Sequence, residues 1–193
     1  MWRLFVASVL HVDFNHLLGN FVLTLMLLSH VEYTIGHFRC LVIYVITAFG
    51  ANIFTALLSP LVIKAGASTC LFGLLGFTLG YVIVNWRGLN IIGKVLKCQV
   101  IYMTFMIIIF IGVLTSFGSN IDYFGHIGGF ITGIGCTGIA TPINNGKLEK
   151  SLRVFFTILL VAQLVVTFTL FYTIPEEELF KVQEPKLWYF NWI

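Results

Sequence analysis

The fold of this chain is decided by two apolar stretches, GASTCLFGLLGFTLGYVIV at residues 66–84 and FGHIGGFITGIGCTGIA at residues 124–140. Each approaches the length of about 20 mostly apolar residues that a helix needs to cross a bilayer. Each also has a reactive side chain near its beginning, Ser68 in the first stretch and His126 in the second. Polar groups are costly inside lipid, so these two residues point to a partner or a task.

The rest of the chain is also unusually apolar. Hydrophobic residues make up 59% of the 193 residues and charged residues only 10%, whereas a soluble domain has about 25% charged residues. The apolar residues come in runs without the alternation that the strands of a membrane barrel show. Because every backbone polar group must be paired inside lipid, these runs are expected to form helices. The sequence predicts an all-α polytopic membrane protein with about six spans, at residues 14–32, 41–58, 66–84, 99–117, 124–140 and 154–174.

The charged residues differ between the two faces of the predicted bundle. Most lysines and arginines fall in loops on the face away from residue 1, and most acidic residues fall on the face of residue 1. The positive-inside rule places the basic face in the cytosol and the other face outside the cell or in a lumen. The basic residues are too scattered to bind nucleic acid. No cysteine pair has CxxC spacing, so we expect no metal and no cofactor.

The topology places Ser68 and His126 at one depth. One out-and-back passage separates the spans at 66–84 and 124–140, so both begin at the face of residue 1. His126, Gly129 and Gly133 share one helical face, and small residues let transmembrane helices approach closely. Such spacing alone more often means packing. Together with Ser68 it favours a Ser–His dyad in which the histidine takes the serine proton.

Candidate donors for an oxyanion occur at the same face. His16 and Asn20 are four residues apart at the beginning of the span at 14–32 and face the same way. The Asn20 amide, a ring N–H of His16 and the backbone N–H of Ser68 can donate to the oxyanion of acyl transfer. The alternative for His16 and Asn20 is an ordinary interhelical hydrogen bond. His11 and His16 are five residues apart, which does not suit a metal pair on one helical face.

These residues together resemble the rhomboid family of intramembrane serine proteases. Residues 66–76 are similar to the family's GASGxxxGLxG segment, and residues 126–133 match its HxxGxxxG helix. The matches run in the family's order from residue 2 to about residue 133, and they include the Trp2-Arg3 pair and the spacing His11-x4-His16-x3-Asn20.

The resemblance implies a role for each of these residues. Ser68 would be the nucleophile and His126 the general base of a catalytic dyad, while Asn20, His16 and the Ser68 backbone would form the oxyanion hole. The implied supporting residues are His11, Phe72, Gly66, Gly129 and Gly133, with Phe72 packed on the His126 ring. Thr69 stands where the family has glycine, and it would either narrow the oxyanion site or donate a hydrogen bond there.

The implied activity is that of an intramembrane serine endopeptidase. It would cleave single-pass transmembrane substrates near the extracellular or luminal face. Residues 1–141 would form the rhomboid catalytic core without the family's first helix, and residues 142–193 a loop, an extra C-terminal transmembrane helix and a short acidic tail. The C-terminal position of the extra helix favours the secretory pathway or plasma membrane over the mitochondrion.

Two other functions stay open at this point. A catalytically inactive rhomboid-like protein would bind transmembrane clients for trafficking or degradation, but such relatives typically lack the serine or the histidine, and this chain has both. A transporter or channel would need ionisable residues along a path through the whole membrane, whereas here they gather at one end.

Overall fold

The computed structural model describes residues 2–11, 14–60, 65–86, 101, 122–141 and 146–175. Within these ranges the chain forms helices and no strands, which confirms the predicted all-α fold for the described part. The predicted span at 99–117 and the acidic tail lie outside the described residues, apart from Ile101. The helices are α1 (Trp2–Val6), α2 (Phe14–Ile35), α3 (His37–Leu58), α4 (Ser68–Val84), α6 (Tyr123–Ala140) and α7 (Lys147–Thr173).

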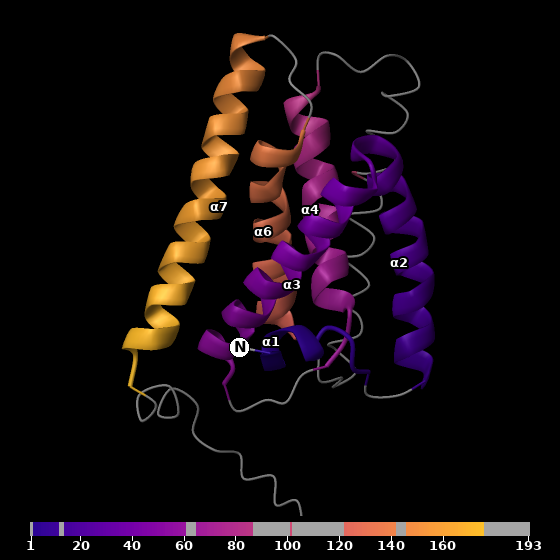
Figure 1. The fold of residues 1–193 in the computed structure, drawn as a ribbon, viewed down its shortest axis with the longest axis vertical. Helices are drawn as coiled ribbons and strands as arrows, with labels where there is room; N and C mark the ends of the chain where they lie inside the picture. Colours follow the sequence, from indigo (N-terminus) through magenta and orange to yellow (C-terminus); the bar gives the residue numbers. More distant parts are fainter. Residues whose placement is uncertain are drawn as a thin grey trace, which may run out of the picture.

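The long helices run up and down one bundle with α4 and α6 inside it (Figure 1). Helices α2 and α7 stand at opposite edges, and α3 crosses in front of the inner pair. Helices α2, α4 and α6 all begin at the lower end in Figure 1, where the short α1 also lies. Ser68 begins α4 and His126 lies in the first turn of α6. The expectation that both residues lie at one end of the bundle is therefore confirmed.

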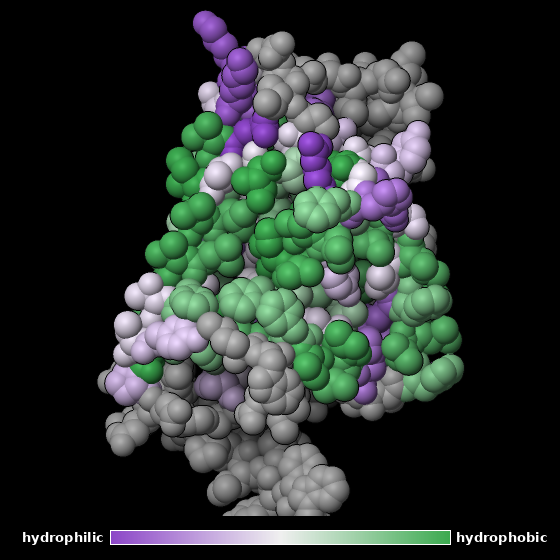
Figure 2. All heavy atoms as spheres, viewed as in Figure 1, coloured by the Kyte–Doolittle hydropathy of each residue, from purple (hydrophilic) through white to green (hydrophobic). Residues whose placement is uncertain are grey.

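Three of the described helices, α2, α3 and α7, are long and apolar enough to cross a membrane. Helix α4 is apolar but has only 17 residues, or about 25 Å of helix against a hydrocarbon core of about 30 Å. Helix α6 contains many glycines and the polar His126. These residues are tolerated there because α3, α4 and α7 cover the helix. The chain is a multi-pass integral membrane protein, and Figure 2 shows the hydrophobic band across its middle.

Glycines bring α4 and α6 into direct backbone contact. A Cβ atom added to Gly133 would overlap the carbonyl oxygen of Gly73, and one added to Gly129 would overlap that of Thr69. Gly76 of α4 meets the α6 backbone in the same way. The packing predicted from the glycine spacing is thus confirmed, and it fixes the separation of the two helices.

Helix α7 lies on the outer face of α6, and one polar residue joins the two. Nε2 of Gln163 donates to the carbonyl oxygen of Gly128 at 3.1 Å and to Oγ1 of Thr132 at 2.7 Å. Leu160 packs against Gly135, where a Cβ atom would meet the α7 backbone at 2.9 Å. The helix that carries His126 is therefore held from two sides, by α4 and by α7.

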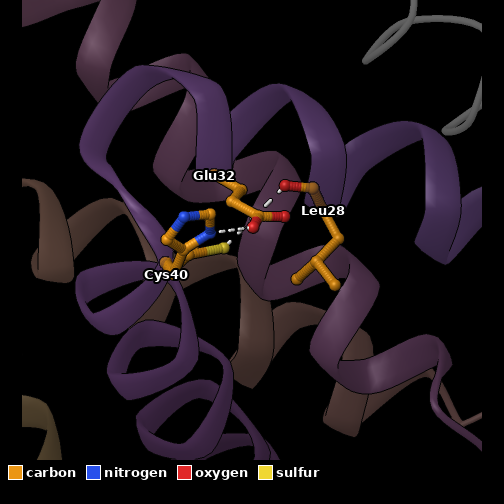
Figure 3. A network of polar contacts seen from close by, with 4 residues as sticks. Leu28, Glu32 and Cys40 are labelled. Carbon is orange, nitrogen blue, oxygen red and sulfur yellow. Dashed lines mark hydrogen bonds and ion pairs between the residues drawn. The ribbon is translucent and has the colours of Figure 1, made fainter.

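A polar turn joins α2 and α3 at the end of the bundle away from Ser68. The Glu32 carboxylate pairs with the His37 imidazole, and Sγ of Cys40 lies 3.9 Å from the carbonyl oxygen of Leu28 (Figure 3). Gly36 between the helices has a φ of 83°, a left-handed conformation that favours glycine. These contacts set the direction in which α3 returns toward the site.

Candidate active site

Ser68 follows a tight turn that is hydrogen-bonded to the residue directly after α1. The backbone N–H of Gly66 donates to the carbonyl oxygen of Ala7 at 2.9 Å. Gly66 has a φ of 153°, which a residue with a side chain rarely adopts. The turn therefore needs glycine at this position, and it delivers Ser68 as the first residue of α4.

Asp122 caps the helix that carries His126. Its carboxylate accepts hydrogen bonds from the backbone N–H of Gly125 at 2.8 Å and from the Thr55 hydroxyl at 2.7 Å. An aspartate at this position stabilises the exposed N–H groups of the first turn. Asp122 itself lies just outside the helix, as the N-cap of α6, and links α6 to α3.

Ser68 and His126 are in hydrogen-bond contact. Oγ of Ser68 lies 2.9 Å from Nε2 of His126, within the range of about 2.6–3.2 Å that a nucleophile and its base require. His126 is only 9% exposed. Its ring stacks on Phe72 with centroids 4.3 Å apart and planes inclined by 25°. Phe72 thus fixes the plane of the imidazole, and Nε2 can accept the serine proton.

Helix α2 supplies donors beside the same turn. A Cβ atom on Gly66 would lie 2.7 Å from Cε1 of His16 and 3.5 Å from Nδ2 of Asn20. Asn20 is 6% exposed, and its Nδ2 atom has no acceptor within the described part of the chain. A buried donor left unpaired costs about 1–3 kcal/mol. An acceptor atom of a ligand next to Ser68 would remove that cost.

His11 holds the turn before Ser68. Nδ1 of His11 donates to the carbonyl oxygen of Val9 at 3.0 Å, and Nε2 accepts the backbone N–H of Ala67 at 3.4 Å. The two bonds together require the tautomer with its proton on Nδ1. The ring also meets His16 edge to face, with centroids 5.3 Å apart. His11 therefore contacts both the serine turn and the α2 donors.

Sequence reasoning missed Asn52 of α3 as part of this region. Its Nδ2 atom donates to the carbonyl oxygen of Leu4 at 2.5 Å and to Oγ of Ser8 at 2.7 Å. Asn52 thereby anchors α1 and the residues that follow it, among them Ala7, which accepts the hydrogen bond from Gly66. The available signal was an amide in the middle of an apolar span, which is costly unless it has partners.

The arrangement suits acyl transfer better than metal chemistry. It combines a serine hydroxyl, an imidazole within hydrogen-bond distance of it and the buried amide of Asn20 at one end of the bundle. In the ranges that the structure describes, no three His, Cys, Asp or Glu side chains gather where they could hold a metal ion. Donors of this kind can stabilise the oxyanion that develops in acyl transfer.

Comparison with known proteins identifies the family. The family described as Rhomboid domain matches residues 1–142. Rhomboid-like protease 3 of Toxoplasma gondii is 33% identical over 134 residues, 69% of this chain and 49% of that protein. RHOMBOID-like protein 6, mitochondrial, of Arabidopsis thaliana is 35% identical over 137 residues, 71% and 42% of the two chains. RHOMBOID-like protein 2 of the same plant is 30% identical over 176 residues, which are 86% of this chain and 53% of that protein. The chain spans about half the length of these relatives.

Proposed function

Because the chain belongs to the rhomboid family, we propose that it is an intramembrane serine endopeptidase with Ser68 as nucleophile and His126 as general base. The observation that carries the proposal is the 2.9 Å contact between Ser68 Oγ and His126 Nε2. The name of one relative, Rhomboid-like protease 3, also supports proteolysis.

The reaction would proceed through an acyl-enzyme. Nε2 of His126 takes the Oγ proton as Ser68 attacks the scissile carbonyl carbon, and a tetrahedral oxyanion forms. The amide of Asn20, the ring of His16 and the Ser68 backbone N–H would donate to that oxygen. His126 then gives the proton to the leaving amine. Water, deprotonated by His126, attacks the ester and regenerates Ser68.

The position of the site suits the end of a transmembrane helix as substrate. Ser68 lies at the beginning of α4, the helix of about 25 Å, which is shorter than a hydrocarbon core of about 30 Å. The nucleophile would therefore lie below the membrane surface, at the face predicted to be outside the cytosol. A helical substrate must unwind before its scissile carbonyl is exposed, because helix hydrogen bonds occupy that group. Small or helix-weakening residues near the cleavage site are expected.

Cleavage of a single-pass substrate tests the proposal. The protein in liposomes is mixed with a transmembrane helix that carries glycine and alanine near one end, and the products are mapped by mass spectrometry. We expect a cut near the end of the helix on the Ser68 side, together with labelling of Ser68 by a fluorophosphonate probe. A folded protein that neither cleaves nor labels would support the inactive, client-binding alternative instead.

The oxyanion role of Asn20 has its own test. Replacing Asn20 with alanine is expected to lower kcat by about 10²–10³-fold with little change in KM, because the donor acts on charge that develops only in the transition state. Asn15→Ala is the matched control, since Asn15 is an exposed residue of the same helix. If Asn20→Ala and Asn15→Ala cleave at the same rate, Asn20 does not donate to the oxyanion.

A further inference from the structure

A second candidate binding site lies at the end of the bundle opposite Ser68. It is a groove of about 510 Å³ between α6 and the beginning of α7. Along α7 its lining changes from cationic to apolar as the helix proceeds toward the middle of the bundle. The lining residues are Gly138, Lys150, Arg153, Val154, Thr157 and Ile158.

Close packing of the two helices positions one of the cations. Nε of Arg153 donates to the carbonyl oxygen of Gly138 at 3.2 Å. A Cβ atom on Gly138 would lie 2.5 Å from the backbone nitrogen of Thr157, so glycine is needed for this approach. The hydrogen bond uses Nε and directs the guanidinium, whose two terminal nitrogens match the geometry of a phosphate.

Within the described part of the chain, no carboxylate pairs with the positive charges of the groove. Glu149 is one helical turn before Arg153, but it is buried and its carboxylate turns back onto Gly146. Among the described residues the structure records no ion pair between either groove cation, Lys150 or Arg153, and an acidic side chain. The part of the groove that is lined by Lys150 and Arg153 is therefore complementary to an anion.

The position of the groove relative to the membrane indicates where that anion would come from. Helix α7 has 27 residues, about 40 Å of helix against a hydrocarbon core of about 30 Å. The excess of about 10 Å corresponds to its charged beginning, residues 147–153, which places Arg153 at headgroup level. Figure 2 shows hydrophilic side chains at this end of α7 and hydrophobic ones directly below. Val154 and Ile158 are 59% and 61% exposed where an acyl chain would lie.

We propose that this groove binds an anionic glycerophospholipid of the adjacent leaflet. Its phosphate would contact Lys150 and Arg153, and an acyl chain would lie along Val154 and Ile158. This end of the bundle is predicted to face the cytosol, and the cytosolic leaflet is the one that carries anionic lipids. A lipid in this position would hold α7 against α6, the helix that carries His126.

Lipid binding to the purified protein in neutral detergent tests the proposal. Native mass spectrometry and thermal unfolding are measured with phosphatidylserine, phosphatidylcholine or glycerol phosphate. We expect one phosphatidylserine to bind with at least about tenfold preference over phosphatidylcholine and to raise Tm, because two cations face its headgroup. Glycerol phosphate should neither bind nor compete, because it has no acyl chain. Equal binding of the two phospholipids, or competition by glycerol phosphate, would overturn the proposal.

Matched charge variants locate the bound lipid. Lys150→Gln/Arg153→Gln should lose the preference for phosphatidylserine. The control Lys147→Gln/Arg39→Gln removes two exposed cations of the same end that lie outside the groove, and it should keep the preference. Lys150→Glu changes only an exposed side chain and leaves the Arg153–Gly138 bond intact, so it reports on the site even if the double variant misfolds. The proposal would be overturned if Lys150→Glu kept the preference for phosphatidylserine, or if Lys147→Gln/Arg39→Gln lost it equally. Either result would mean that the lipid is attracted to the basic face as a whole and not to the groove. Neither readout depends on proteolysis.

Discussion

Replacing Ser68 with alanine is expected to abolish both substrate cleavage and fluorophosphonate labelling while the bundle remains folded. Removal of a serine nucleophile lowers kcat by about 10⁴–10⁶-fold in enzymes of this chemistry. The neighbouring hydroxyl of Thr69 cannot replace it, because successive residues of a helix point about 100° apart and the Thr69 side chain is buried among the helices at 4% exposure. Cleavage rates and probe labelling in liposomes provide the measurement.

Ser59→Ala is the matched control for this variant. Ser59 is a buried serine at the C-terminal end of α3, and the cap there is made by its backbone N–H to the Thr55 carbonyl oxygen, not by its hydroxyl. We expect Ser59→Ala to cleave and label like the wild type. Ser68→Ala loses one hydrogen bond to His126, so its free energy of unfolding should fall by only about 0.5–1.5 kcal/mol. If Ser68→Ala cleaved the substrate at the wild-type rate, Ser68 could not be the nucleophile.

The sequence was sufficient to predict which end of the bundle holds Ser68 and His126. Helices that cross a membrane alternate in direction, so the order of the spans determines the end at which each begins. Glycine spacing then indicates which faces meet, and the structure confirms the contact of Gly133 with Gly73. Depth and helical face are both properties of a local sequence pattern, which is why they could be predicted.

The backbone turn before Ser68 could not be predicted in the same way. Its path depends on contacts between residues far apart in the chain, such as the bond of Gly66 to Ala7 and that of Ala67 to His11. Neither is encoded by periodicity. The anchoring of α1 by Asn52 and the capping of α6 by Asp122 are further contacts of this kind. Local patterns give a residue's depth and face, but they do not give its tertiary partner.

The enclosure of α6 illustrates a second limit of the sequence pattern. The prediction treated residues 124–140 as a span like the others, whereas the structure surrounds α6 with α3, α4 and α7. A helix enclosed by other helices contacts little lipid, so glycines and a histidine are tolerated there. The family match ends at residue 142, before α7, yet Gln163 of α7 hydrogen-bonds to the α6 helix beside His126. The last helix thus contributes to the support of the site.

Replacing Gly133 with alanine is expected to cause a large loss of stability. The new Cβ atom would overlap the carbonyl oxygen of Gly73 and lie 2.9 Å from the backbone nitrogen of Phe77. These are backbone atoms, so the clash is relieved only if α4 and α6 separate. Overpacking of this kind costs about 1–3 kcal/mol or more. Thermal unfolding in detergent should show the lower stability.

Activity should fall together with stability in Gly133→Ala, because the same helix contact sets the 2.9 Å distance between Ser68 and His126. A displacement of about 1 Å between reacting groups can cost about 10²-fold in rate. Gly19→Ala is the control, since a Cβ atom on Gly19 of α2 has no neighbour within 4 Å. It should unfold at the wild-type temperature or slightly above, because alanine favours a helix over glycine by about 1 kcal/mol. If both variants matched the wild type in stability and rate, α4 and α6 would have to be farther apart than backbone contact allows. Ser68 and His126 would then need another source for their alignment.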